Sequence, residues 1–327
     1  MREKERLDHK QDRGWGWPEY YCEFDYFSEA VVRAGCHPRK MVHKNPTGRS
    51  IVLIHGLTDS PFFLTAIGEY FHTCLGYNVY LPLLQGHGLK DPKGMVGVSL
   101  SEWKKNVRFA IRTAHSLGGR LSLGGLSAGG ALSFFMACRE PEVDGDLYLF
   151  SPALGLFGDR FGVIGRLKEI ILRLGITRYF DSRRPLVGDH PYRYERVTYN
   201  SAEELAVLIR ENQRFMAELG RNNLPSRRIF TAWTECDRVV SLERIEELEQ
   251  IVGNSLFTSY IIPENLGVKH ACVVLKEPVY AVGAGGGQAP LEDANPYFAQ
   301  MMEAVSDFAT CREPESVEYF SYKASGA

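Results

Sequence analysis

The feature that most constrains the fold is a regular alternation, from about residue 50, of short apolar runs with longer segments of helical periodicity. The run Ile51–Ile54 is continuously apolar, as in a strand that is covered on both faces. Further strands are predicted at 77–81, 121–123, 147–150, 228–233 and 257–262, and helices at 61–73, 100–117, 128–139, 202–219, 242–252 and 294–310. This alternation predicts an α/β fold with a mostly parallel central sheet and helices on both faces.

One stretch interrupts the alternation. Val163, Leu167, Ile170 and Leu174 follow helical spacing, and an Arg- and Tyr-rich stretch comes after them. We interpret residues 154–200 as an inserted cap over a pocket; a packing helix followed by a surface loop is the alternative. The remaining divisions are an N-terminal extension (1–45) made of a charged tail and an aromatic-rich packing segment, a core (46–153 and 201–311) and a C-terminal tail (312–327).

Composition and charge exclude several classes of function. The chain has 38 Lys and Arg against 40 Asp and Glu, so nothing favours nucleic acid or an anionic membrane. Its longest nearly apolar run, 147–158, is too short to span a bilayer, and no apolar segment follows the charged first residues. The seven cysteines are widely spaced and form no CxxC pair, which argues against a zinc site. We therefore expect a cytoplasmic protein without stable membrane insertion, metal or cofactor.

The main chemical signal is the sequence Gly125-Leu126-Ser127-Ala128-Gly129, which follows a predicted strand and begins a predicted helix. A GxSxG string in this position is typical of a tight turn that exposes a nucleophilic serine at the edge of a sheet. Glycine is needed at 125 and 129 because side chains on either side of the turn would collide. The pattern predicts Ser127 as a nucleophile.

A serine hydroxyl needs a base to take its proton and an acid to orient that base. In enzymes with this turn, the acid and then the base follow the serine along the chain. Of the nine histidines only His190 and His270 follow Ser127; His190 lies in the expected cap, whereas His270 follows the last strand. We therefore expect His270 to be the base. Asp237, in the loop after the preceding strand, is the expected acid, with Glu235 as its competitor.

The oxyanion that forms during acyl transfer needs at least two hydrogen-bond donors. The backbone N–H of Ala128 is the first candidate, because it begins a helix directly after the nucleophile. The second is the N–H of Leu57, in the turn after the first core strand, where Gly56 lets the backbone approach the site. His55 is expected to hold that turn by hydrogen bonds.

Several of these motifs together resemble one family. The segments Ile54–Leu57, Leu81–Gly88 and Asp237–Val240, the Gly125–Gly129 turn and His270 are similar to the carboxylesterase and monoacylglycerol lipase branch of the α/β-hydrolase fold serine hydrolases. The resemblance implies a cap at 154–200 with an acyl pocket beneath it. The stretch from His270 to about residue 292 is longer than the resemblance leads us to expect.

These observations predict a serine carboxylesterase that forms an acyl-enzyme on Ser127 and acts on small-molecule esters, namely short- to medium-chain esters or monoacylglycerols. An acyltransferase, thioesterase or peptidase with the same three residues is the alternative, and a non-catalytic ligand-binding member of the fold is a more remote one. From position alone, we expect the acyl group to contact apolar residues of the cap: Leu154, Leu156, Phe157, Phe161 and Ile164.

Overall fold

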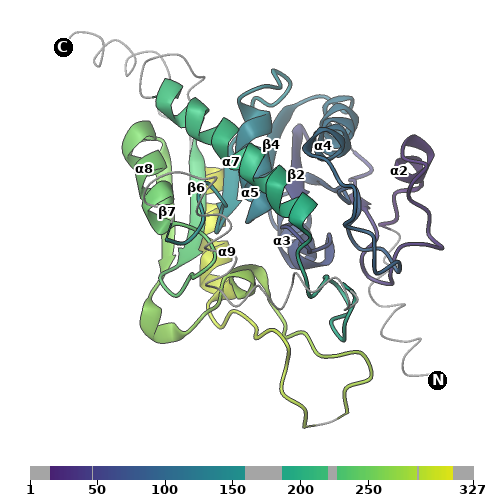
Figure 1. The fold of residues 1–327 in the computed structure, drawn as a ribbon. Helices are drawn as coiled ribbons and strands as arrows, with labels where there is room; N and C mark the ends of the chain where they lie inside the picture. Colours follow the sequence, from purple (N-terminus) through teal and green to yellow (C-terminus); the bar gives the residue numbers. More distant parts are fainter. Residues whose placement is uncertain (1–14, 46, 159–185, 220–226, 286, 312–327) are drawn as a thin grey trace.

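A seven-stranded sheet forms the centre of the protein (Figure 1). The computed structural model describes residues 15–45, 47–158, 186–219, 227–285 and 287–311. The strands are β1 (Arg39–Met41), β2 (Arg49–Ile54), β3 (Asn78–Leu81), β4 (Arg120–Leu126), β5 (Leu147–Phe150), β6 (Ile229–Thr234) and β7 (Phe257–Ile262). Their order across the sheet is β1-β3-β2-β4-β5-β6-β7, and every pair is parallel except β1 with β3. The prediction of a mostly parallel central sheet is confirmed.

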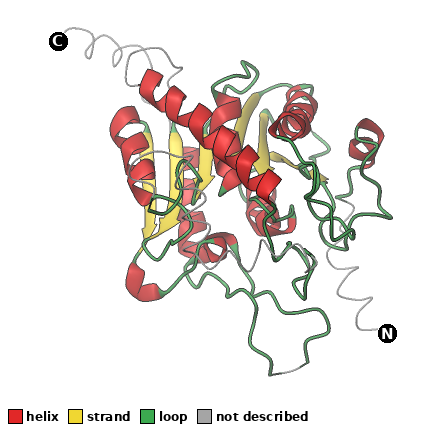
Figure 2. Cartoon of the chain, in the orientation of Figure 1, coloured by secondary structure: helices red, strands yellow, loops and turns green. Residues whose placement is uncertain are grey.

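Helices cover both faces of this sheet, as the alternation predicted (Figure 2). The apolar side chains of β2 show why, because Val52 and Ile54 belong to one buried cluster while Ile51 and Leu53 belong to the other. Helices α3 (Phe62–Thr73) and α9 (Phe298–Thr310) contribute to the second cluster; α4 (Leu100–His115), α5 (Ala128–Ala137), α7 (Tyr199–Leu219) and α8 (Leu242–Val252) contribute to the first. Helix α7 packs across α4, α5 and α8.

The aromatic segment near the N-terminus packs beside α4. It contains the short helix α2 (Pro18–Glu23), and the rings of Trp17 and Tyr20 are buried, each 5.7 Å from the ring of Phe109. The edge strand β1 follows it and was not located from the sequence. Its three residues, Arg-Lys-Met, are too short and too polar to show a strand pattern.

Strand β4 is longer than predicted, since it continues through Gly124 and Gly125 to Leu126. Glycine has a low intrinsic preference for strands, but both glycines pair with β2 and β5 in the middle of the sheet. After β7 the chain forms two short 3₁₀ helices, η2 (Glu264–Leu266) and η3 (Ala271–Val274). Within the described ranges, no helix has both the length and the apolar character that a membrane span requires.

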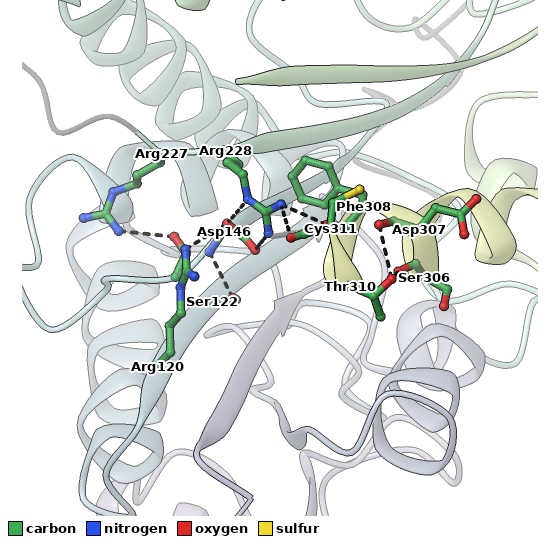
Figure 3. A network of polar contacts seen from close by, with 11 residues as sticks. Arg120, Ser122, Asp146, Arg227, Arg228, Ser306, Asp307, Phe308, Thr310 and Cys311 are labelled. Atoms are coloured by element: carbon green, nitrogen blue, oxygen red, sulfur yellow. Dashed lines mark hydrogen bonds and ion pairs between the residues drawn. The ribbon is translucent and has the colours of Figure 1, made fainter. Parts of the chain in front are cut away.

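A buried ion pair joins three elements at the amino-terminal edge of the sheet (Figure 3). Arg228, just before β6, binds both carboxylate oxygens of Asp146, just before β5, at 3.1 and 2.7 Å. The same guanidinium donates to the carbonyl oxygens of Phe308 and Cys311, at the end of α9, at 3.1 and 3.0 Å. Such carbonyls have no partner within their own helix, so Arg228 also caps α9.

Replacing Arg228 by Met leaves Asp146 buried without its main counterion. We expect Arg228→Met to lower the free energy of unfolding by about 3–5 kcal/mol, measured by urea denaturation. Arg120→Met is the matched control, because Arg120 also binds Asp146, at 3.1 Å, but its side chain is 39% exposed against 9% for Arg228. The control should lose about 1 kcal/mol or less. Equal losses in the two variants would contradict this account of the pair.

Candidate active site

Ser127 lies at the sharp turn between β4 and α5, with backbone angles of φ 54° and ψ −118°. A non-glycine residue with positive φ is strained, and the surrounding backbone must hold it in place. Here the N–H of Ser127 donates to the carbonyl of Phe150 at 2.9 Å, and its carbonyl accepts from the N–H of Ala153 at 2.9 Å. Strand β5 and the loop after it therefore fix the serine at the carboxyl-terminal edge of the sheet.

The glycines around Ser127 are required by close backbone contacts. A Cβ on Gly129 would overlap the carbonyl oxygens of Ile54 and His55, at the end of β2. A Cβ on Gly125 would overlap the backbone of Gly129 itself. The first turn of α5 can approach β2 only because neither position carries a side chain, and this agrees with the steric reason given for the motif.

Asp237 and His270 are in direct contact. The carboxylate oxygen Oδ2 of Asp237 lies 2.6 Å from Nδ1 of His270, and the Asp237 side chain is fully buried. Burial by itself raises the pKa of Asp237, but the interaction with His270 and hydrogen bonds from the N–H groups of Val239 and Val240 outweigh it and lower that pKa. Asp237 is therefore ionised at neutral pH.

An ionised carboxylate only accepts hydrogen bonds, so Nδ1 of His270 carries a hydrogen, and in the neutral ring Nε2 then has the lone pair. This is the tautomer that a general base needs. His270 directly precedes η3, and the loop before it is held by a hydrogen bond of 2.9 Å from the Thr234 hydroxyl to the Val268 carbonyl. The loops after β6 and β7 thus bring Asp237 and His270 together at the same edge of the sheet as Ser127.

The turn after β2 lies against Ser127. The position that a Cβ of Gly56 would occupy is 3.3 Å from Cβ of Ser127. Leu57 follows in this turn, and Thr58 closes it with a φ of 72°. Ala128, the first residue of α5, has a backbone N–H that lacks a partner within the helix. The two expected oxyanion donors therefore belong to backbone segments that meet at the serine.

His55 supports the turn instead of taking part in the chemistry. Its Nε2 accepts from the N–H of Leu84 at 3.1 Å, and its Nδ1 then donates to the Gly56 carbonyl at 2.9 Å. Burial, followed by the nearby ring of His87, lowers the pKa of His55 well below its usual value. The ring is a neutral, fully bonded support for the loop that carries Leu57.

Glu235, the competing acid, and His190, the other histidine after Ser127, make different contacts. Glu235 is exposed, and its carboxylate accepts from the backbone N–H of Glu264 at 2.9 Å. The ring of His190 stacks on that of Phe63 at 5.9 Å, and burial together with nearby arginines lowers the pKa of His190 to about 3. Within the ranges that the structure describes, no group of three or more His, Cys, Asp or Glu side chains is arranged to hold a metal ion.

The structure describes three of the five residues that we expect to contact the acyl group. Leu154 is fully buried in the core, and Leu156 forms an isolated bridge with Val240, close to Asp237. Phe157 is 39% exposed, with the guanidinium of Arg238 over its ring. Phe161 and Ile164 lie outside the described residues.

A cluster of charged side chains that sequence reasoning did not single out lies beside the turn after β2. Its members are Asp59, Arg193 and Glu292. Asp59 follows Leu57 by two residues, so the sequence already indicates that it lies near the expected oxyanion donor. Nothing in the sequence connects it to Arg193, 134 residues later in the chain.

Comparison with known proteins supports this architecture. No protein-family model and no curated protein sequence matches the chain. Solved structures with similar folds include a metagenome-derived lipolytic enzyme of the pair LipS and LipT (19% identity, 85% of this chain and 98% of the other, TM-score 0.59). A monoglyceride lipase from Saccharomyces cerevisiae (12% identity, 84% and 90%, TM-score 0.55) and a monoacylglycerol lipase from Paleococcus ferrophilus (16% identity, 84% and 97%, TM-score 0.53) are also similar. The strand order, the turn at Ser127 and these similarities show that the chain has the α/β-hydrolase fold.

Proposed function

We propose that the protein is a serine carboxylesterase in which Ser127, His270 and Asp237 form the catalytic triad. The observation that carries the proposal is the buried contact of 2.6 Å between Asp237 and His270, at the same sheet edge as a serine held at positive φ. A strained serine at this turn has little structural value unless its hydroxyl is used. The similar lipolytic enzymes and monoacylglycerol lipases support an ester as the substrate.

In the first half of the proposed reaction, Oγ of Ser127 attacks the ester carbonyl while Nε2 of His270 takes the hydroxyl proton. The carbonyl oxygen becomes an oxyanion, which the N–H groups of Leu57 and Ala128 stabilise. Asp237 stabilises the imidazolium that forms. As the tetrahedral intermediate collapses, the bond to the alcohol oxygen breaks and His270 returns its proton to that oxygen. An acyl-enzyme and a free alcohol result.

In the second half, a water molecule takes the place of the alcohol. His270 removes one of its protons as the water oxygen attacks the acyl carbonyl, and the same two backbone N–H groups bind the oxyanion. The bond to Oγ of Ser127 then breaks, and His270 returns the proton to that oxygen. The carboxylic acid leaves, and the enzyme is restored.

We propose short- to medium-chain esters or monoacylglycerols as substrates. Two apolar residues at the start of the expected cap pack beside the loop that carries Asp237: Leu156 is partly buried and Phe157 is 39% exposed. Apolar surface at this edge suits an acyl chain.

Hydrolysis of p-nitrophenyl esters from acetate to palmitate tests the proposal. We expect an optimum at a short or medium acyl chain, and a loss of at least about 10⁴-fold in kcat for Ser127→Ala, because the nucleophile is then absent. Ser116→Ala is the matched control; Ser116 is exposed at the end of α4, so this variant should retain the parent rate.

Labelling with a fluorophosphonate probe distinguishes a failure of the ester-hydrolysis proposal from a failure of the catalytic triad. Labelling of Ser127 without turnover of any ester would refute ester hydrolysis and favour a thioesterase, a peptidase or an acyltransferase. Absence of both labelling and turnover would refute the catalytic triad itself.

Asp237→Asn tests the assignment of the acid. The amide can donate to Nδ1 of His270 and favour the wrong tautomer, so kcat should fall by about 10⁴-fold. Glu235→Gln, two residues away on the same loop, should keep kcat within about threefold, because its side chain is exposed and its carboxylate accepts from the backbone N–H of Glu264. A larger loss for Glu235→Gln than for Asp237→Asn would reverse the assignment.

A further inference from the structure

Residues 190–194 are held against the turn after β2. The Ser60 hydroxyl donates to the Tyr192 carbonyl at 2.7 Å, and the N–H of Tyr194 donates to the Thr58 carbonyl at 2.9 Å. Between these two contacts, the Arg193 side chain reaches the Asp59 carboxylate at 3.2 Å. Residues 190–194 of the expected cap are therefore bonded directly to the turn that carries Leu57.

Asp59 places a buried carboxyl group beside the expected catalytic residues. Its side chain is 4% exposed. A Cβ on Gly56 would overlap Oδ2 of Asp59 and would also lie 3.3 Å from Cβ of Ser127, so the carboxylate and the serine both lie close to this glycine. The pKa of Asp59 is raised above its usual value, because burial outweighs the opposing guanidinium of Arg193; Glu292 adds to the rise, and His270 opposes it when it is protonated. Asp59 is thus within electrostatic range of His270 as well.

A carboxylate in this position opposes the proposed reaction unless a positive charge neutralises it. The ground-state ester is neutral, but a full negative charge develops on its carbonyl oxygen next to Ser127 in the transition state. Charges in a buried, water-poor site interact more strongly than in water. An uncompensated Asp59 would therefore raise the barrier of the chemical step and would have little effect on binding of the neutral ester.

Arg193 is placed to supply that positive charge. Its Nε lies 3.2 Å from Oδ1 of Asp59, one terminal nitrogen lies 2.7 Å from Glu292, and the other donates to the Thr58 hydroxyl at 3.4 Å. Its side chain is only 25% exposed. These three contacts, made by the three nitrogens of one planar guanidinium, hold it against the turn.

We propose that Arg193 is a positioning residue that neutralises Asp59 and so keeps the oxyanion site next to Ser127 favourable for negative charge. This rests on the proposed function, since it concerns the oxyanion of the same ester hydrolysis. The role is electrostatic, and it is separable from the mechanical connection between residues 190–194 and the turn.

The test is steady-state hydrolysis of a p-nitrophenyl ester by Arg193→Met, Asp59→Asn and the double variant Asp59→Asn/Arg193→Met. We expect Arg193→Met to lower kcat about 10- to 100-fold, somewhat less than the loss of an oxyanion donor, with KM within about threefold of the parent value. The double variant carries neither charge, and its kcat should return to within about threefold of that of Asp59→Asn.

Arg33→Met is the matched control for mechanical loosening. Arg33 also binds this segment. It donates to the carbonyl oxygens of His190 and Arg193 at 3.1 and 3.2 Å, and neither of these two bonds involves Asp59. Its loss should weaken the attachment of the segment and leave kcat within about threefold of the parent value.

The outcomes separate the two proposals. If the parent protein hydrolyses no ester, the proposed function fails. If the parent is active but the double variant is as slow as Arg193→Met, the role of Arg193 is purely structural and the inference is overturned. Should Arg193→Met not fold, the double variant still decides: it lacks every contact of the guanidinium, and a kcat close to that of Asp59→Asn is expected only if charge compensation is the role.

Discussion

The strained turn at Ser127 depends on a close approach of two backbone segments. Helix α5 begins directly against the end of β2, where the carbonyl oxygens of Ile54 and His55 leave no room for a Cβ on Gly129. The same approach brings Gly56 next to Ser127. One steric constraint therefore fixes the backbone of the expected nucleophile and also places the two backbone N–H groups of the proposed oxyanion site near it.

Two acid–cation pairs flank the site and have opposite consequences. Asp237 binds His270 and favours the protonated imidazole of the proposed transition state. Asp59 lies close to Gly56 and Ser127, where a free negative charge would disfavour the oxyanion, and there the partner is a permanent cation, Arg193. The buried pair of Arg228 and Asp146 lies at the opposite edge of the sheet, where it joins the starts of β5 and β6 to the end of α9.

The sequence predicted most of the sheet because strands buried on both faces give continuous apolar runs, as in Ile51–Ile54, and because the helices between them have a clear period. It also predicted the serine turn, since the glycine spacing reflects contacts local to the chain. The edge strand β1 was missed because a strand of three residues leaves no readable pattern. Of the expected cap, the structure describes residues 154–158 and 186–200, and Phe161 and Ile164 lie outside these ranges.

The sequence by itself determined the fold class, the serine turn and a short set of candidates for acid and base, because each is encoded by local spacing and by order along the chain. Tertiary structure decided which acidic side chain meets His270: Asp237 is turned inward by the N–H groups of Val239 and Val240, whereas Glu235 faces outward. It alone joined Arg193 to Asp59, since ion pairs between distant segments depend on how the chain folds back and leave no periodic trace in the sequence.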